Sequence, residues 1–334
     1  MKKVTIADVA QHAGVSKSTV SQYLNQRFDY MGEDTKNRIE ETIKVLGYRP
    51  NILARSLKQK STTTIGVIVA NILHIFSTQV IRAIEDVCNE KDFHVIICNA
   101  DDQPEKEKKY IDMLRAKQVD GLILFPTGKN VEQYQELISE NYPVVFIDRL
   151  IIGLQTDTVL LDNEKASFLA VDSFVKHGYS KIAVLSPPIE PDVTPRVERL
   201  SGYKKALEHH ELFIREEFIV SGKTTDMQSL IHHLFQLSDP PKAILATNDR
   251  SLMELLSYVK KNKLSIPEDI GLIGIDDVSF ADIYNPALTT VAQPAFEMGE
   301  KAAELLFQRI QQKEEANQAE IYRFEPTLIQ RESL

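Results

Sequence analysis

The fold of the amino-terminal part of this chain is decided by residues 5–25, TIADVAQHAGVSKSTVSQYLN. Thr5 followed three residues later by Asp8 is typical of a helix start, because each side chain can bond the other residue's backbone N–H. Apolar residues then recur at helical spacing as far as Ala13. Gly14 permits the left-handed backbone that turns a chain sharply. The pattern therefore predicts a short helix that ends in a tight turn.

A second short helix is predicted directly after this turn. Ser16 can cap a helix over residues 17–25, with Val20 on its buried side. A third helix is predicted over residues 33–46, where Ile39 and its apolar neighbours follow helical spacing. Two short helices joined by a glycine turn, the second with a polar outer face, indicate an all-α helix-turn-helix domain.

The polar outer face of the second helix is suited to nucleic acid. Its side chains can hydrogen-bond base edges and phosphates. Together with the two capping residues, the side chains expected to contact DNA are Thr5, Ser16, Lys17, Ser18, Thr19, Ser21, Gln22 and Asn25. The alternative is a helix face that meets only solvent.

The distribution of charge favours the DNA interpretation. The chain carries 39 Lys and Arg against 48 Asp and Glu, a net charge of −9. Residues 1–60 hold eleven basic against six acidic residues, or +5, so the remainder carries −14. A small basic segment on a large acidic one predicts that only the first meets a polyanion.

Residues 47–60, GYRPNILARSLKQK, predict an extended entry followed by a helix over residues 52–58, capped by Asn51. Such a helix has about two turns and is marginal in water without a partner, because helix nucleation is costly. Two copies meeting at a minor groove would place Leu57 between base steps and Arg55 near phosphates. A plain linker is the alternative.

The motifs VTIADVA, AGVSKSTVS and YRPNILARSL, within residues 4–57, resemble the lac repressor/galactose repressor family of transcription factors. The resemblance implies that the second helix reads the major groove and that Leu57 opens the minor groove. Gln22 stands where most members carry arginine. Since Gln favours adenine and Arg favours guanine, we expect an operator half-site different from the common one.

The remainder of the chain alternates apolar runs of strand length with amphipathic stretches. Strands are predicted at residues 65–70, 94–99, 121–126, 144–148, 159–162, 181–186, 218–220, 243–247 and 271–276. Helices are predicted at residues 77–90, 105–117 and 131–140. Continuous apolar strands separated by helices indicate parallel sheets covered on both faces. Two such series predict an α/β body of two doubly wound lobes, with a cleft at the carboxyl ends of the strands.

This body resembles the type I periplasmic-binding-protein fold that the family uses to recognise effectors, through motifs such as RLSGY at 199–203 and IGIDD at 273–277. The resemblance implies a homodimer joined through the body, and chain crossings between lobes near 162, 290 and 322. The expected domains are a helix-turn-helix domain at 1–48, a hinge at 49–62, a first lobe at 63–162 with 291–321, and a second lobe at 163–290 with 322–334.

Strand ends and matched motifs nominate the residues of an effector site. They are Phe76, Phe125, Arg149, Arg199, Asn248 and Asp276. The last three match effector contacts that the resemblance implies, and the aromatic rings are suited to stack on a sugar ring. For Asp276 a strand-end turn, and for Arg149 a surface ion pair, are the structural alternatives.

The expected cleft is rich in arginine, with Arg149, Arg196, Arg199 and Arg250 near strand ends or helix starts. Neutral sugars do not require so many guanidiniums, whereas a carboxylate or phosphate does. We therefore expect a small anionic, sugar-derived effector. Within the family, QYLN and FDYM, residues 22–31, are most similar to regulators that respond to 2-keto-3-deoxygluconate. A neutral sugar, or a ligand or partner acting as corepressor, stays open as an alternative.

Other classes of protein fit the sequence less well. No nucleophile elbow, phosphate-binding glycine loop or His-Glu-x-x-His motif indicates an enzyme. Cys88 and Cys98 are too few for a disulfide framework or a zinc cage, so no metal or cofactor is expected. A transport receptor would need a secretion signal, and the first residues lack its apolar stretch.

The apolar stretch at 65–72 is shorter than the roughly 20 residues of a membrane span. Together these features predict a cytoplasmic, non-enzymatic protein without a membrane partner. Its predicted function is to repress genes of carbohydrate or sugar-acid catabolism by binding double-stranded operator DNA until an effector releases it.

Overall fold

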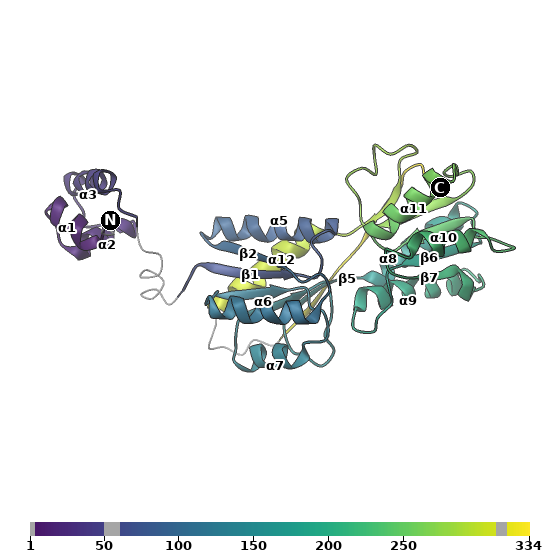
Figure 1. Cartoon of the computed structure of the whole chain (residues 1–334), viewed down its shortest axis with the longest axis horizontal. Coiled ribbons are helices and arrows are strands. Elements are labelled where there is room, and N and C mark those ends of the chain that lie inside the picture. The colour runs from purple at the N-terminus through teal and green to yellow at the C-terminus, as the bar shows by residue number, and fades with distance from the viewer. Residues whose placement is uncertain (1–3, 50–60, 312–318) are drawn as a thin grey trace. The chain divides into compact units, whose positions relative to one another are not determined.

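The computed structural model describes residues 4–49, 61–311 and 319–334. The chain forms two compact units, Met1–Thr62 and Thr63–Leu334, called the head and the body below (Figure 1). Among the described residues, no helix combines the length and the apolarity needed to cross a membrane.

The head contains the three predicted helices, α1 (Ile6–Ala13), α2 (Lys17–Leu24) and α3 (Glu33–Leu46). The N–H of Thr5 donates to Oδ2 of Asp8 at 2.7 Å, and the N–H of Asp8 donates to Oγ1 of Thr5 at 3.4 Å. Gly14 ends α1 with a φ of 64°, in the left-handed region. The helix-turn-helix prediction is confirmed, with α2 ending one residue before the expected Asn25.

The core of the head joins its three helices. Val9 of α1, Val20 of α2 and Ile39 of α3 are each 0% exposed. Each fully buried aliphatic side chain contributes about 1.5–3 kcal/mol. These contacts hold the outer face of α2 at the surface of a small, packed domain.

The described strands of the body form two six-stranded sheets. The first sheet has the order β11-β5-β4-β3-β1-β2 and contains β1 (Thr64–Val69), β2 (His94–Asn99), β3 (Gly121–Leu124), β4 (Val144–Ile147), β5 (Thr158–Leu161) and β11 (Ile321–Phe324). The second has the order β12-β10-β9-β8-β6-β7 and contains β6 (Ile182–Ser186), β7 (Ile219–Ser221), β8 (Ala243–Ala246), β9 (Gly271–Ile275), β10 (Thr289–Ala292) and β12 (Thr327–Ile329).

Helices cover both sheets. The first lobe carries α5 (Ile75–Glu90), α6 (Pro104–Ala116), α7 (Val131–Ser139) and α12 (Ala295–Gln311). The second lobe carries α8 (Asn163–Lys176), α9 (Thr194–His209), the short η1 (Glu216–Phe218), α10 (Met227–Phe235) and α11 (Asp249–Lys261). Apart from the antiparallel β12, neighbouring strands are parallel. The predicted pair of doubly wound lobes is confirmed.

The two lobes repeat one strand order, so β4 of the first corresponds to β9 of the second. Each of these strands is followed by an aspartate with left-handed backbone, Asp148 with a φ of 73° and Asp276 with a φ of 85°. The chain thus turns sharply at the same place in both lobes. These turns bring two carboxylates to the carboxyl ends of the sheets.

The chain crosses between the lobes three times. The first crossing lies at Asp162, between β5 and α8. The second was expected near 290 but follows Ala292, because β10 pairs with β9 of the second sheet. The third was expected near 322 but follows Phe324, because β11 pairs with β5 of the first sheet. The sequence patterns do not reveal β10, β11 or β12, which are short. In addition, β11 and β12 pair with strands on the far side of a crossing. In Figure 1 the yellow α12 accordingly lies beside the blue α5.

The backbones of helices α8 and α9 of the second lobe lie close together at Gly202. A Cβ atom at this position would lie 2.1 Å from the carbonyl oxygen of Glu164 in the first turn of α8. Only glycine fits between these backbones. The contact fixes the place of α9, which carries Arg199.

Candidate functional site

The exposed surface of α2 presents most of the side chains that the sequence assigns to DNA. Ser16, Lys17, Ser18 and Gln22 are exposed, and Thr19, Ser21 and Asn25 are half-buried. Oγ of Ser16 accepts the N–H of Thr19 at 3.1 Å, and Nδ2 of Asn25 donates to the carbonyl of Ser21 at 2.7 Å. Among the described contacts, none uses the side chains of Lys17 and Gln22. Among the polar side chains of this face, those of Lys17 and Gln22 are therefore the most available for contacts with DNA.

Thr5 is also exposed, and its hydroxyl donates to Oδ2 of Asp8 at 2.7 Å. The three predicted hinge contacts, Asn51, Arg55 and Leu57, lie outside the described residues. Their assignment to DNA stays a prediction.

A cavity of about 70 Å³ lies between the two lobes, at the carboxyl ends of their strands. It brings together all six residues that the sequence nominates for an effector, namely Phe76, Phe125, Arg149, Arg199, Asn248 and Asp276. Three come from each lobe. We call this cavity the inner cleft.

The apolar wall of the inner cleft comes from the first lobe. The rings of Phe76 and Phe125 meet edge to face, with centroids 6.2 Å apart. Both side chains are buried. Such a wall is suited to the apolar face of a sugar ring.

Arg149 lies in the first lobe and is 5% exposed. Its Nη2 donates to Oδ1 of Asp102 at 2.6 Å, and its Nη1 donates to the carbonyl of Pro126 at 3.2 Å. Its Nε lies 3.5 Å from Oδ2 of Asp148 and has no hydrogen-bond partner among the described residues. Arg149 does form an ion pair, as the alternative interpretation expected, but this pair lies in the cleft, where Arg149 is buried. Burial raises the pKa of Asp148, and the neighbouring Arg149 opposes that rise.

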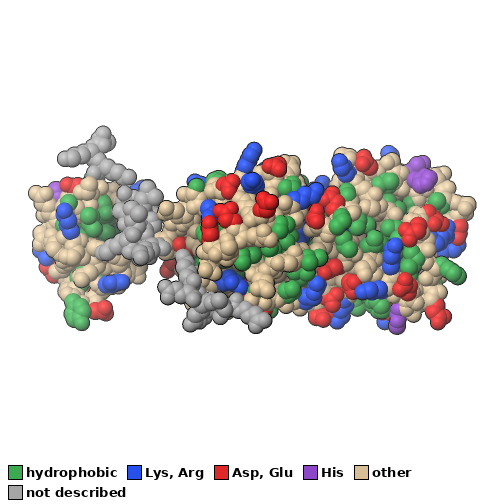
Figure 2. All heavy atoms as spheres, turned by 90° about the horizontal axis from the view of Figure 1, so that it is seen from below, with side chains coloured by type: hydrophobic (Ala, Val, Ile, Leu, Met, Phe, Trp, Pro, Cys, Tyr) green, Lys and Arg blue, Asp and Glu red, His purple; other side chains and the backbone are tan. Residues whose placement is uncertain are grey.

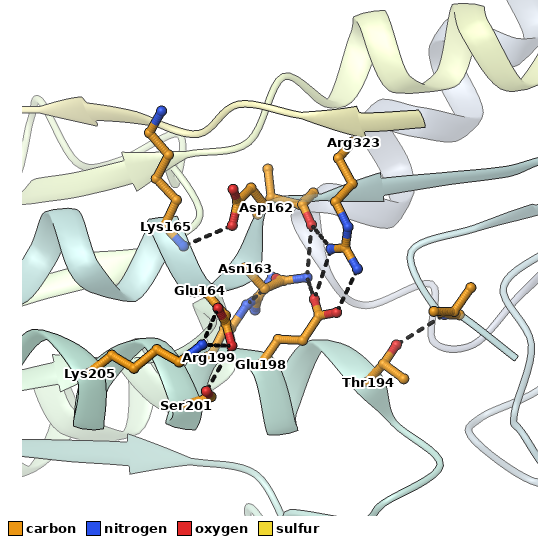
Figure 3. A network of polar contacts seen from close by, with 12 residues as sticks. Asp162, Asn163, Glu164, Lys165, Thr194, Glu198, Arg199, Ser201, Lys205 and Arg323 are labelled. Carbon is orange, nitrogen blue, oxygen red and sulfur yellow. Dashed lines mark hydrogen bonds and ion pairs between the residues drawn. The ribbon is translucent and has the colours of Figure 1, made fainter. Parts of the chain in front are cut away.

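Arg199 lies in the second lobe and is 7% exposed (Figure 3). Its Nε donates to Oδ1 of Asn163 at 2.8 Å, and its Nη1 donates to the carbonyl of Thr247 at 2.6 Å. Nδ2 of Asn163 donates in turn to Glu198 at 3.1 Å, and Glu198 pairs with Arg323 of β11 at 3.0 Å. This network orients the guanidinium and leaves its Nη2 outside the described hydrogen bonds.

Asp276 is held from two sides. Nε2 of Gln293 donates to its Oδ1 at 2.6 Å, and the N–H of Asp249 donates to its Oδ2 at 3.1 Å. Burial raises the pKa of Asp276, and Arg199 opposes the rise. The residue is thus both the strand-end turn that was the alternative and a lining group of the cleft. Asn248 similarly caps α11, since its Oδ1 accepts the N–H of Ser251 at 2.9 Å.

Hydrogen bonds join the two lobes across the cleft. Asp249 of the second lobe meets Nδ1 of His74 at 2.6 Å and accepts the N–H of Ile75 at 2.9 Å. The N–H of Leu150 in the first lobe donates to Oγ1 of Thr194 in the second at 3.0 Å. Sequence reasoning missed His74, Asp249 and Thr194 as interlobe contacts. Their place at helix starts was the available signal, but partners 175 and 44 residues apart follow only from the fold.

The described residues contain no group of three His, Cys, Asp or Glu side chains arranged to hold a metal ion. Arg250, expected in the cleft, lines an outer cavity and not the inner cleft. The chemistry of the inner cleft is therefore that of hydrogen bonds, charge and an aromatic wall.

Comparison with known proteins agrees with both parts of the chain. Residues 5–51 match the family described as bacterial regulatory proteins, lacI family, and residues 171–334 match the periplasmic binding protein-like domain. The chain is 50% identical to the probable HTH-type transcriptional regulator EndR of Paenibacillus polymyxa, covering 99% of this chain and 98% of that protein. It is 34% identical to the HTH-type transcriptional regulator KdgR of Bacillus subtilis (strain 168), covering 99% and 97%.

Among solved structures, the chain is similar to the Lac repressor bound to ONPG in the repressed state, with a TM-score of 0.86, 25% identity and 100% coverage of both chains. Full-length similarity to curated regulators, together with the head and the two-lobed body, leaves one assignment. The chain belongs to the LacI family of DNA-binding transcriptional regulators, which are not enzymes.

Proposed function

We propose that this protein is a cytoplasmic repressor of genes for carbohydrate or sugar-acid catabolism. It binds operator DNA as a homodimer and is released by a small sugar-derived acid such as 2-keto-3-deoxygluconate. The observation that carries the proposal is one cleft in which arginines of both lobes, Arg149 and Arg199, are buried beside an aromatic wall.

The charge of the inner cleft supports an acid over a neutral sugar. Arg149, Arg196 and Arg199 line it against the carboxylates Asp148 and Asp276. Burial raises the pKa of both carboxylates. Their negative charge, which would repel an anionic ligand, is therefore reduced. In contrast, acidic and basic side chains are interspersed over the face of the body seen in Figure 2.

Release follows if the ligand prefers one arrangement of the lobes. The bonds from Asp249 to His74 and from Thr194 to Leu150 join the lobes, and a ligand between them changes how strongly they are held together. The two lobes in turn set the spacing of the hinge segments of a dimer. A coupling of about 1–3 kcal/mol shifts operator affinity roughly 5–150-fold.

A titration separates the acid from the neutral alternative. We expect 2-keto-3-deoxygluconate to bind the purified protein in calorimetry and to release it from operator DNA, with galactose much weaker in both assays. Tighter binding of galactose would reject the acid effector. Strengthened operator binding by the acid would identify a corepressor instead.

Acidification should tighten the binding of an acid effector. An anion between Asp148 and Asp276 raises their already elevated pKa further, so the complex binds more protons than the free protein. Affinity therefore rises as the pH falls toward the raised pKa values of these two carboxyl groups. Calorimetry in buffers of different ionisation enthalpy measures the proton uptake. Affinity that weakens on acidification, with no protons taken up, contradicts the proposal.

A Gln22→Arg substitution should change the preferred half-site. The exposed Gln22 is suited to adenine, and arginine at the same place pairs with guanine, a discrimination of about 1–3 kcal/mol. Selection from oligonucleotides with randomised half-sites reads out the preference. As a control, Lys17→Ala should weaken binding to all sequences alike and reduce the salt slope by about 1. An unchanged preference in the Arg variant would remove Gln22 from base reading.

A further inference from the structure

A second, larger cavity adjoins the inner cleft. This outer cleft encloses about 420 Å³. The two spaces share Asn71, His74, Arg149, Arg196 and Asn248 along their walls. The shared lining residues place the two cavities side by side, so a ligand that occupies both would pass Arg196.

Cations from both lobes line the outer cleft. Lys129 lies in the first lobe before α7, Lys223 in the second lobe between β7 and α10, and Arg250 in the first turn of α11. Within the part of the chain that the structure describes, none of the three forms an ion pair. Lys129 and Lys223 are exposed, and Arg250 is half-buried.

The carboxylates of the same cavity are mostly engaged. Asp101 pairs with Lys106 at 2.5 Å, and Asp102 pairs with Arg149 at 2.6 Å and Arg196 at 3.4 Å. Glu254 accepts Nε2 of Gln228 at 2.7 Å. The amide of Gln228 is neutral, so Glu254 and the exposed Glu190 are the two carboxylates left to oppose the outer cations.

We propose that the effector is an elongated sugar acid with two anionic groups. The first group binds Arg149 and Arg199 in the inner cleft, and the second binds Lys223 and Arg250 of one lobe and Lys129 of the other. This inference rests on the proposed function and adds the length and second charge of the ligand. By bridging cations of both lobes, the second group favours one lobe arrangement over the other.

Two kinds of compound carry a second anion, a sugar acid with a phosphate ester and a sugar acid with a second uronic acid unit. Guanidinium and ammonium groups bind both carboxylate and phosphate. Calorimetry on the full-length protein with two matched pairs separates them. The first pair is gluconate and 6-phosphogluconate, and the second is galacturonate and digalacturonate.

We expect the second anion to tighten binding at least about tenfold in one of the two pairs. The double variant Lys223→Gln/Arg250→Gln should lose most of that gain. The control variant is Lys242→Gln. Lys242 is exposed and lies at the amino end of β8, at the edge of the sheet opposite the clefts. This variant should retain the gain in affinity.

Equal affinities within both pairs, or a gain that persists in the double variant, would overturn the second anionic site while leaving the single-acid effector in place. Binding of galactose with no binding of any of the four acids would instead overturn the proposed function itself. The pair that shows the gain identifies the source of the second anion.

Discussion

An Arg199→Ala variant is expected to remain on operator DNA at effector concentrations that release the unchanged protein. Arg199 is buried in the inner cleft, with two of its nitrogens held by Asn163 and Thr247 and Nη2 outside these bonds. Truncating one partner of a buried, hydrogen-bonded charge pair costs about 2–5 kcal/mol. Effector affinity should therefore fall at least about 30-fold.

The measurement is a pair of titrations, operator binding without ligand and release by ligand. Arg199→Lys is the matched variant, because it keeps the charge and loses the planar guanidinium that contacts Asn163 and Thr247 together. It should retain a partial response. Release of the Ala variant at the same ligand concentration as the unchanged protein would remove Arg199 from the effector site.

A Gly202→Ala substitution should strongly destabilise the body, although alanine normally stabilises a helix by about 0.5–1 kcal/mol over glycine. The added Cβ would lie 2.1 Å from the carbonyl oxygen of Glu164 and 2.7 Å from its carbonyl carbon. Both neighbours are backbone atoms, so no rotamer change relieves the overlap. We expect a loss of about 3 kcal/mol or more in the free energy of unfolding.

Urea denaturation of the full chain measures this loss. Glu208→Ala is the control, since Glu208 is an exposed residue of the same helix with no close backbone neighbour to displace. It should change stability by less than about 0.5 kcal/mol. A Gly202→Ala protein as stable as the control would show that α8 and α9 can separate without penalty.

Local signals explain why the head could be predicted residue by residue. The Thr5–Asp8 capping pair and the left-handed Gly14 act over a few residues, and the structure shows both. The strands of the body were similarly evident from apolar runs, because both faces of each parallel sheet are covered. Phe125, Arg149, Asn248 and Asp276 could be nominated as cleft residues because the strand ends of such folds meet at one edge. Arg199 was nominated from its place at a helix start and from its motif.

Contacts between distant segments could not be predicted in the same way. The interlobe bond from His74 to Asp249 spans 175 positions, and no periodicity marks it. The position of β11 depends on its pairing with β5. The register of this pairing is set only once the sheet has assembled. The ion pair between Arg149 and Asp102 could not be predicted either, because the sequence patterns pointed to Arg149 and not to its partner.

The three crossings have a consequence for synthesis. The first sheet begins at β1, but β11, its last strand, and α12, which covers it, come after the whole run from α8 to β10. On the ribosome, a nascent chain therefore cannot complete the earlier lobe before most of the later one has emerged. Met298, Ala302 and Leu306 of α12 are each 0% exposed, so until they arrive the partly made protein presents a bare apolar surface to the cell.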